Sequence, residues 1–126
     1  MRWQRSNYEL FSRLVHPFFA EQRRDVSAKI LEQYPDRVPV IVERDPKARI
    51  ADIDKKKFLA PAEISVAKFI SEIRKHIKLG RQESLFVFVA NNVMPQPNST
   101  MSQVYSQHKD PDGFLYVVYS SENAFG

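Results

Sequence analysis

The side chains that could support catalysis or bind a metal are few in this chain, and they lie far apart in the sequence. There is no cysteine, which excludes disulfides, thiolate metal sites and a cysteine nucleophile. The histidines, His16, His76 and His108, do not have the short spacing of metal ligands. No pairing of a nucleophile with a general base is visible. We therefore expect no metal, no cofactor and no enzymatic activity.

One acidic segment resembles a calcium-binding loop only superficially. Asp110, Asp112 and Gly113 follow one another closely, but a proline interrupts them and the glutamate expected at the twelfth position is missing. Proline, aspartate and glycine together are typical of a tight turn. The segment is predicted to be a turn that leads into the last strand.

The last glycine is conspicuous, because the sequence has only three. Gly80 follows a predicted helix and Gly113 lies in a predicted turn, where glycine has a backbone role. Gly126 has no such role. It follows a short polar stretch, residues 120–123, and ends the sequence after Phe125.

Length and composition indicate one globular domain. The chain has 126 residues, of which 43% are hydrophobic and 27% charged, as in ordinary soluble proteins. The sequence lacks an apolar run of membrane-spanning length and an N-terminal signal block. Its net charge of +4 makes acidic partners possible, such as anionic lipid, acidic peptides or nucleic acid, although a soluble basic domain explains the charge equally well.

Apolar periodicity predicts four helices and four strands. The helices are expected over residues 3–15 and 19–33, from the N-cap Ser65 to a stop at Gly80, and from Ser99 or Thr100 to Gln107. The strands are expected over residues 37–43, 55–61, 85–90 and 114–119. Pro39 cannot donate a ladder hydrogen bond, so it should lie at a bulge or at an unpaired position.

The last strand should be central in the sheet, because residues 114–119 are apolar on both alternating faces. The element order then favours an α+β fold of the β-grasp type. This fold has a four-stranded mixed sheet with the last strand beside the first, and here two extra N-terminal helices cover the sheet. A ferredoxin-like arrangement is the alternative.

Several segments resemble the autophagy ubiquitin-like modifiers, the family of GABA-receptor-associated protein and microtubule-associated protein light chain three. The similarity spans about residues 16–126 and is carried by residues 34–43 (YPDRVPVIVE), 54–59 (DKKKFL), 69–75, 112–116 (DGFLY) and the ending Phe125–Gly126. It implies a ubiquitin-like β-grasp core over residues 34–120, with a helical extension over 1–33 and a conjugation tail over 121–126. It also implies a modifier and adaptor that is not an enzyme.

The resemblance gives Gly126 a role. In this family, activating and conjugating enzymes pass the terminal glycine carboxylate through thioesters to the amine of phosphatidylethanolamine, and a cysteine protease processes precursors and removes the lipid. Glycine suits this chemistry because it has no Cβ to hinder attack on its carbonyl. The implied location is the cytoplasm and, through the lipid, the autophagosome membrane, with no nucleic acid as partner.

The resemblance also implies that the chain binds aromatic-x-x-aliphatic motifs of autophagy receptors, with the motif added as a strand at residues 57–60. Carried over residue by residue, the aromatic pocket would comprise Ile30, Pro39, Lys57, Leu59 and Phe114, and the aliphatic pocket Phe58, Pro61, Ile64 and Phe69. Lys55 and Arg74 would contact acidic residues that flank the motif.

Two residues depart from the family pattern at these pockets. Val26 stands where a glutamate is common, and Glu72 stands where many members have leucine. An insertion at Ala90 is expected to form a bulge. Beside the modifier, a second interpretation is a non-conjugated basic module that docks on cytoskeletal or membrane surfaces.

Overall fold

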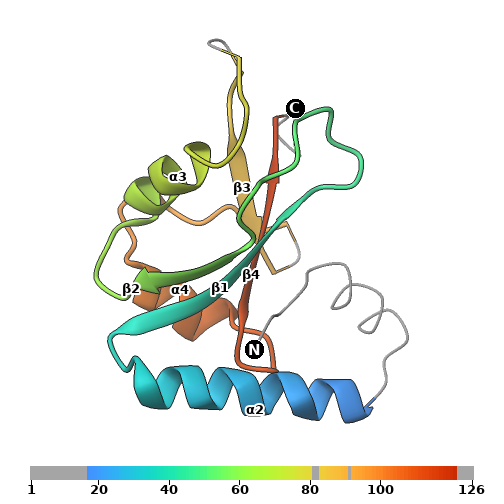
Figure 1. Cartoon of the computed structure of the whole chain (residues 1–126). Helices are drawn as coiled ribbons and strands as arrows, with labels where there is room; N and C mark the ends of the chain where they lie inside the picture. Colours follow the sequence, from blue (N-terminus) through green and yellow to red (C-terminus); the bar gives the residue numbers. More distant parts are fainter. Residues whose placement is uncertain (1–16, 81–82, 91, 122–126) are drawn as a thin grey trace.

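The structure is a computed structural model that describes residues 17–80, 83–90 and 92–121 (Figure 1). Its elements are α2 (Pro17–Gln33), β1 (Arg37–Arg44), β2 (Lys57–Pro61), α3 (Val66–Arg74), β3 (Phe86–Val89), α4 (Met101–His108) and β4 (Leu115–Ser120). The helix predicted over residues 3–15 and the tail from 122 to Gly126 lie outside the described residues.

The strands form a four-stranded sheet in the order β2-β1-β4-β3. The central pair is parallel, with Val40 opposite Leu115, whereas β2 and β3 pair antiparallel at the two edges. The last strand therefore lies beside the first, as the sequence predicted, and the mixed sheet is that of a β-grasp. The ferredoxin-like alternative is wrong.

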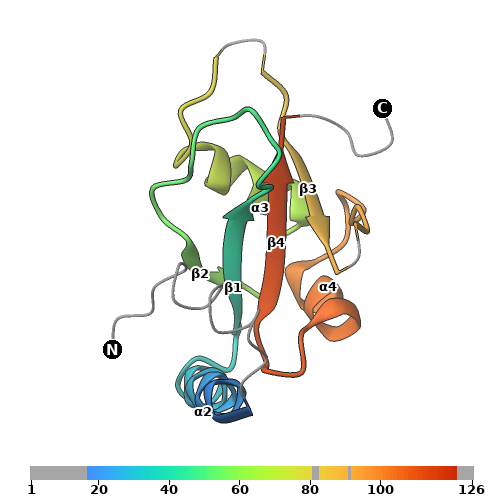
Figure 2. The same ribbon diagram turned by 90° about the vertical axis from the view of Figure 1, so that its right-hand side faces the viewer.

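One face of β4 lies in the main core. Leu115, Val117 and Tyr119 are buried together with Phe69 and Ile73 of α3. On the other face, Tyr116 and Val118 are only half-buried. The strand was expected to be covered on both faces. This expectation is confirmed for the face that packs against α3, whereas the other face is only partly covered. Figures 1 and 2 show α2 lying across the end of the sheet at which β1 and β4 begin.

Proline sets the geometry of the first two elements. α2 begins at Pro17, two residues before its predicted start, because proline fits the first helical position, where no N–H partner is needed. In β1, the Val42 N–H donates to the Lys56 carbonyl at 2.7 Å. Because the backbone groups of successive residues in a strand point to opposite sides, the Pro39 nitrogen points toward β4. The pairing of β1 with β4 starts only at Val40. The Pro39 nitrogen therefore faces a position without a ladder hydrogen bond, as predicted, although Pro39 itself lies opposite Leu59 of β2.

The predicted N-caps of the two later helices are confirmed. The Ser65 hydroxyl accepts from the Lys68 N–H at 3.0 Å, and the Thr100 side chain accepts from the Gln103 N–H at 3.1 Å within a capping box. The predicted stop of the third helix at Gly80 is wrong. α3 ends at Arg74. In the turn that follows, the hydrogen bonds span three residues instead of four, such as the bond from the His76 N–H to the Ile73 carbonyl at 3.0 Å.

The insertion at Ala90 forms a turn after β3. Ala90 and Asn92 have positive φ angles of 49° and 61°. The Val89 and Val93 backbones exchange hydrogen bonds of 2.7 and 2.9 Å across this turn. The expected bulge is therefore replaced by a turn that ends the strand.

A buried carboxylate joins α2 to the turn before β4. Asp112 is 3% exposed and accepts from Arg23 Nε at 3.1 Å, from the Phe114 N–H at 2.9 Å and from the Tyr116 hydroxyl at 2.5 Å. The Ser27 hydroxyl donates to the Asp112 carbonyl at 2.6 Å. These bonds confirm that the acidic segment is a turn, and they hold α2 at the end of the sheet.

Candidate functional site

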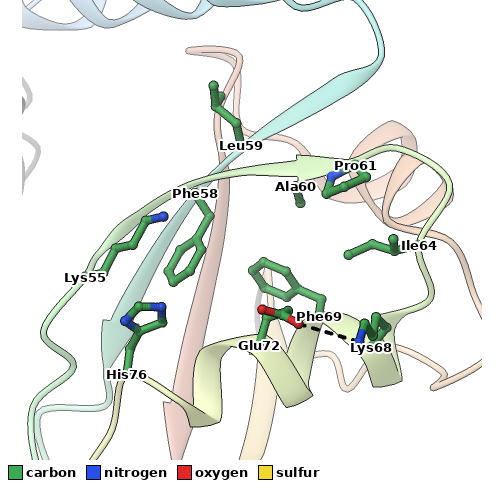
Figure 3. A pocket seen from close by; sticks show the side chains of 10 residues that line it. All are labelled: Lys55, Phe58, Leu59, Ala60, Pro61, Ile64, Lys68, Phe69, Glu72 and His76. Atoms are coloured by element: carbon green, nitrogen blue, oxygen red, sulfur yellow. Dashed lines mark ion pairs between the residues drawn. The ribbon is translucent and has the colours of Figure 1, made fainter.

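A hollow among the described residues lies between strand β2 and helix α3 (Figure 3). Its volume is about 280 Å³. It is lined by Lys55, Phe58, Leu59, Ala60, Pro61, Ile64, Lys68, Phe69, Glu72 and His76. All four residues assigned to the aliphatic pocket from the sequence, Phe58, Pro61, Ile64 and Phe69, are thus brought together. We call this hollow the β2–α3 pocket.

Strand alternation and helix spacing place these side chains. Phe58 and Ala60 of β2 point toward α3, where Phe69 faces them, and His76 stands in the turn just after α3 (Figure 3). The Phe58 ring meets the Phe69 ring edge to face at 5.7 Å and the His76 ring at 5.6 Å. The pocket therefore has an aromatic floor of a half-buried Phe58 ring and a buried Phe69 ring, against which an apolar side chain can pack.

Charged groups surround the apolar floor. The Lys55 ammonium lies 4.8 Å from the centre of the Phe58 ring, a cation–π arrangement. Glu72 forms ion pairs with Lys68 at 3.6 Å and Lys75 at 3.2 Å. The hydrogen bond from Lys75, with a smaller effect of Lys68, lowers the pKa of Glu72, so this carboxylate is ionised at neutral pH.

The imidazole of His76 is held at the wall of the pocket by the preceding loop. Its Nδ1 lies 2.8 Å from Asp54 Oδ1, and the Asp54 N–H donates to the His76 carbonyl at 3.0 Å. These two contacts tie the end of α3 to the loop that leads into β2.

Strand β2 stands at an edge of the described sheet, next to the pocket. Because the Lys56 carbonyl faces β1, alternation directs the backbone groups of Leu59 away from β1. The Leu59 carbonyl accepts a long bond of 3.4 Å from the Arg37 side chain on this side. An added peptide strand would approach β2 from the same direction.

Three residues assigned to the aromatic pocket, Lys57, Leu59 and Pro39, lie on the opposite face of the β1–β2 pair. Leu59 pairs across the strands with Pro39, and its side chain points away from the β2–α3 pocket in Figure 3. Leu59 is 39% exposed, whereas Pro39 and Phe114 are buried. Lys57 is exposed and Ile30 of α2 is half-buried.

The remaining assigned residues divide between the pocket and its surroundings. Lys55 lines the pocket, whereas Arg74 is exposed on α3 and is not among the lining residues. Val26 is half-buried on α2. Gly126, the assigned conjugation residue, lies outside the described residues.

Sequence reasoning did not assign Ala60, Lys68 or His76 to the pocket. A usable signal was present, because Lys68, Glu72 and His76 recur every four residues and so share one face of a helix. Which strand faces that helix surface could not be read from the spacing. In the part of the chain that is described, no cluster of metal-binding side chains occurs and no helix is long and apolar enough to cross a membrane.

Comparisons with known proteins give a consistent result. Residues 22–126 match the family model described as "Autophagy protein Atg8 ubiquitin like". Autophagy-related protein 8d of Arabidopsis thaliana is 50% identical over 111 residues, covering 88% of this chain and 90% of the relative. Autophagy-related protein 8 of Dictyostelium discoideum is 49% identical over 112 residues, covering 88% and 89%. The crystal structure of Trypanosoma brucei ATG8 superposes with a TM-score of 0.76 at 39% identity, covering 85% of this chain and 91% of that one.

Proposed function

This chain belongs to the Atg8 family of ubiquitin-like autophagy proteins, and from that membership we propose that it is a lipid-conjugated adaptor, not an enzyme. The carboxylate of Gly126 forms an amide with the amine of phosphatidylethanolamine after activation and transfer by the pathway's enzymes. A cysteine protease reverses the link. The cytoplasmic protein becomes attached to the autophagosome membrane through this lipid.

We further propose that the β2 edge binds short motifs of the aromatic-x-x-aliphatic type. The observation that carries this proposal is the β2–α3 pocket, which lies directly beside an edge strand. A motif strand added to β2 would place alternate side chains on opposite faces. One would reach Phe58 and Phe69 in the β2–α3 pocket, and the other would reach Leu59 on the far face.

Charge on this surface suits motifs flanked by acidic residues. Lys55 lies at one end of the β2–α3 pocket, and Lys57, Lys68 and Arg74 are exposed near it. Exposed ion pairs contribute little individually, about 0.2–1 kcal/mol each. Their main effect is therefore on the association rate, which should fall as salt is added.

Motif binding is tested with a labelled aromatic-x-x-aliphatic peptide in a fluorescence polarisation titration. Phe58→Ala and Leu59→Ala should each weaken binding about tenfold or more, because each removes a large apolar contact from one face of β2. Val93→Ala is the matched control, since Val93 is 41% exposed against 39% for Leu59 but lies after β3. Unchanged affinity in both β2 variants would reject the binding site.

Conjugation is tested by intact-mass spectrometry after reaction with ATP, the activating and conjugating enzymes, and vesicles that contain phosphatidylethanolamine. A lipid-sized mass increase is expected for the wild type and not for Gly126→Ala. Vesicles of phosphatidylcholine alone are the control, because their headgroup has no primary amine. If the enzymes are active and intact Gly126 gains no lipid mass, the conjugation proposal fails.

A further inference from the structure

The β2–α3 pocket contains an acceptor that an apolar occupant cannot use. Glu72 has the one carboxylate among the ten lining residues, and Figure 3 shows it beside the Phe69 ring on the side of α3 that faces β2. An ionised carboxylate accepts hydrogen bonds and cannot donate them. The Glu72 side chain is 39% exposed, so its carboxylate can be reached by a side chain that enters the pocket.

Two lysines hold this carboxylate in place. Lys68 lies one helical turn before Glu72 at 3.6 Å, and Lys75 lies three residues after it at 3.2 Å. Both contacts favour the ionised form. The acceptor is therefore charged, and it is paired from both directions along α3 before any partner arrives.

Three classes of occupant can be compared on these contacts. A purely aliphatic side chain would cover part of the carboxylate without offering it a donor, and such burial is unfavourable. A cationic side chain would offer a donor but would meet Lys55 and Lys68, which already line the pocket. A neutral side chain with an apolar body and a donor at its tip avoids both penalties.

From this geometry we propose that the residue of the bound motif that enters the β2–α3 pocket is a tyrosine, and that Glu72 selects it. The inference rests on the motif binding proposed above and refines its aliphatic position. The phenol ring packs against the Phe58 and Phe69 rings, which already meet edge to face at 5.7 Å, and its hydroxyl donates to the Glu72 carboxylate. The volume of about 280 Å³ is roughly nine times the ~30 Å³ share of one water molecule, enough for a ring with its hydroxyl.

The test uses three peptides that are identical except at the position entering the pocket, which is tyrosine, phenylalanine or leucine. Each is titrated against the wild type, Glu72→Gln and Glu72→Leu. The wild type should bind the tyrosine peptide about three- to tenfold tighter than the phenylalanine peptide. Glu72→Leu should lose this preference and bind the leucine peptide tightest, whereas Glu72→Gln, which keeps an acceptor oxygen, should retain part of it.

The matched control is Glu63→Leu, because Glu63 is an exposed carboxylate just before α3 that does not line the pocket. It should leave all three affinities unchanged. A wild type that binds the leucine peptide best, or a tyrosine preference that persists in Glu72→Leu, would overturn the assignment of Glu72 while leaving motif binding intact. If none of the peptides binds the wild type, motif binding itself fails, and the inference fails with it.

Discussion

Ser27 and Gly113 lie so close together that helix α2 and the turn before β4 leave no room for a side chain between them. A Cβ built on Gly113 would lie 2.9 Å from Ser27 Cβ and would overlap the Ser27 hydroxyl oxygen. Gly113 also has a φ angle of +90°, which residues with a Cβ rarely adopt. The contact therefore requires glycine for two separate reasons.

We predict that Gly113→Ala lowers the free energy of unfolding by about 2 kcal/mol or more, because backbone strain and the overlap with Ser27 add together. Urea unfolding followed by circular dichroism measures this change. Gly80→Ala is the control, since the nearest neighbour of its added Cβ is the flexible end of Glu83 at 3.1 Å. Equal effects of the two substitutions would contradict the prediction.

The buried carboxylate of Asp112 should be a large contributor to stability. Asp112→Ala removes the acceptor for Arg23, Tyr116 and the Phe114 N–H, so we expect a loss of about 3 kcal/mol. Thermal unfolding of Asp112→Ala and of Asp36→Ala, an exposed aspartate before β1, provides the comparison. A small effect of Asp112→Ala, similar to that of Asp36→Ala, would show that the Arg23 contact does not hold α2.

Tyr119 should make stability fall at alkaline pH. Burial raises the pKa of Tyr119 from 10.0 to about 12, and its hydroxyl donates to the Ala51 carbonyl at 2.9 Å. Between these two values the unfolded chain has lost the phenol proton while the native protein keeps it. The free energy of unfolding therefore decreases as pH rises from about 10 to about 12.

Tyr119→Phe should cost about 1 kcal/mol at pH 8, where the Ala51 hydrogen bond is intact. The difference between the wild type and Tyr119→Phe should shrink as pH rises above 10. Burial also raises the pKa of Tyr105, so some alkaline destabilisation should remain in the variant. Urea unfolding at pH 8, 10 and 11 tests this, and a difference that stays constant with pH would refute it.

The capping box of α4 should contribute measurably to the stability of the fold. Thr100→Ala removes the bond to the Gln103 N–H, so we expect a loss of about 1 kcal/mol. Ser102→Ala, an exposed position inside the same helix, is the control and should be neutral or slightly stabilising. Chemical unfolding of both variants separates the cap from the general helix propensity.

The sheet was predictable because its pattern is local. Two-sided apolar character placed residues 114–119 in the middle of the sheet, and the missing N–H of Pro39 required an unpaired position. Both follow from side chains that are close in sequence. The end of α3 was missed because it depends on the loop before β2, where Asp54 binds His76 at 2.8 Å.

The pocket could be predicted only in part, for the same reason. The family pattern supplied Phe58 and Phe69, but no spacing in the sequence reveals that β2 faces the side of α3 that carries Lys68 and the turn after it that carries His76. That relationship arises from packing between segments that are distant along the chain. The departure from the family pattern at Glu72 was visible in the sequence, but only the structure shows which side chains surround this carboxylate.

The parallel pairing of β1 with β4 also constrains when this protein can fold. Val40 finds its partner Leu115 only near the far end of the chain, and β3 has no strand to pair with in the sheet until β4 is in place. During synthesis, helix α2 and the β1–β2 pair can form early, but the sheet must wait for residues 115–120 to leave the ribosome. Such distant contacts slow folding and leave strand edges exposed meanwhile.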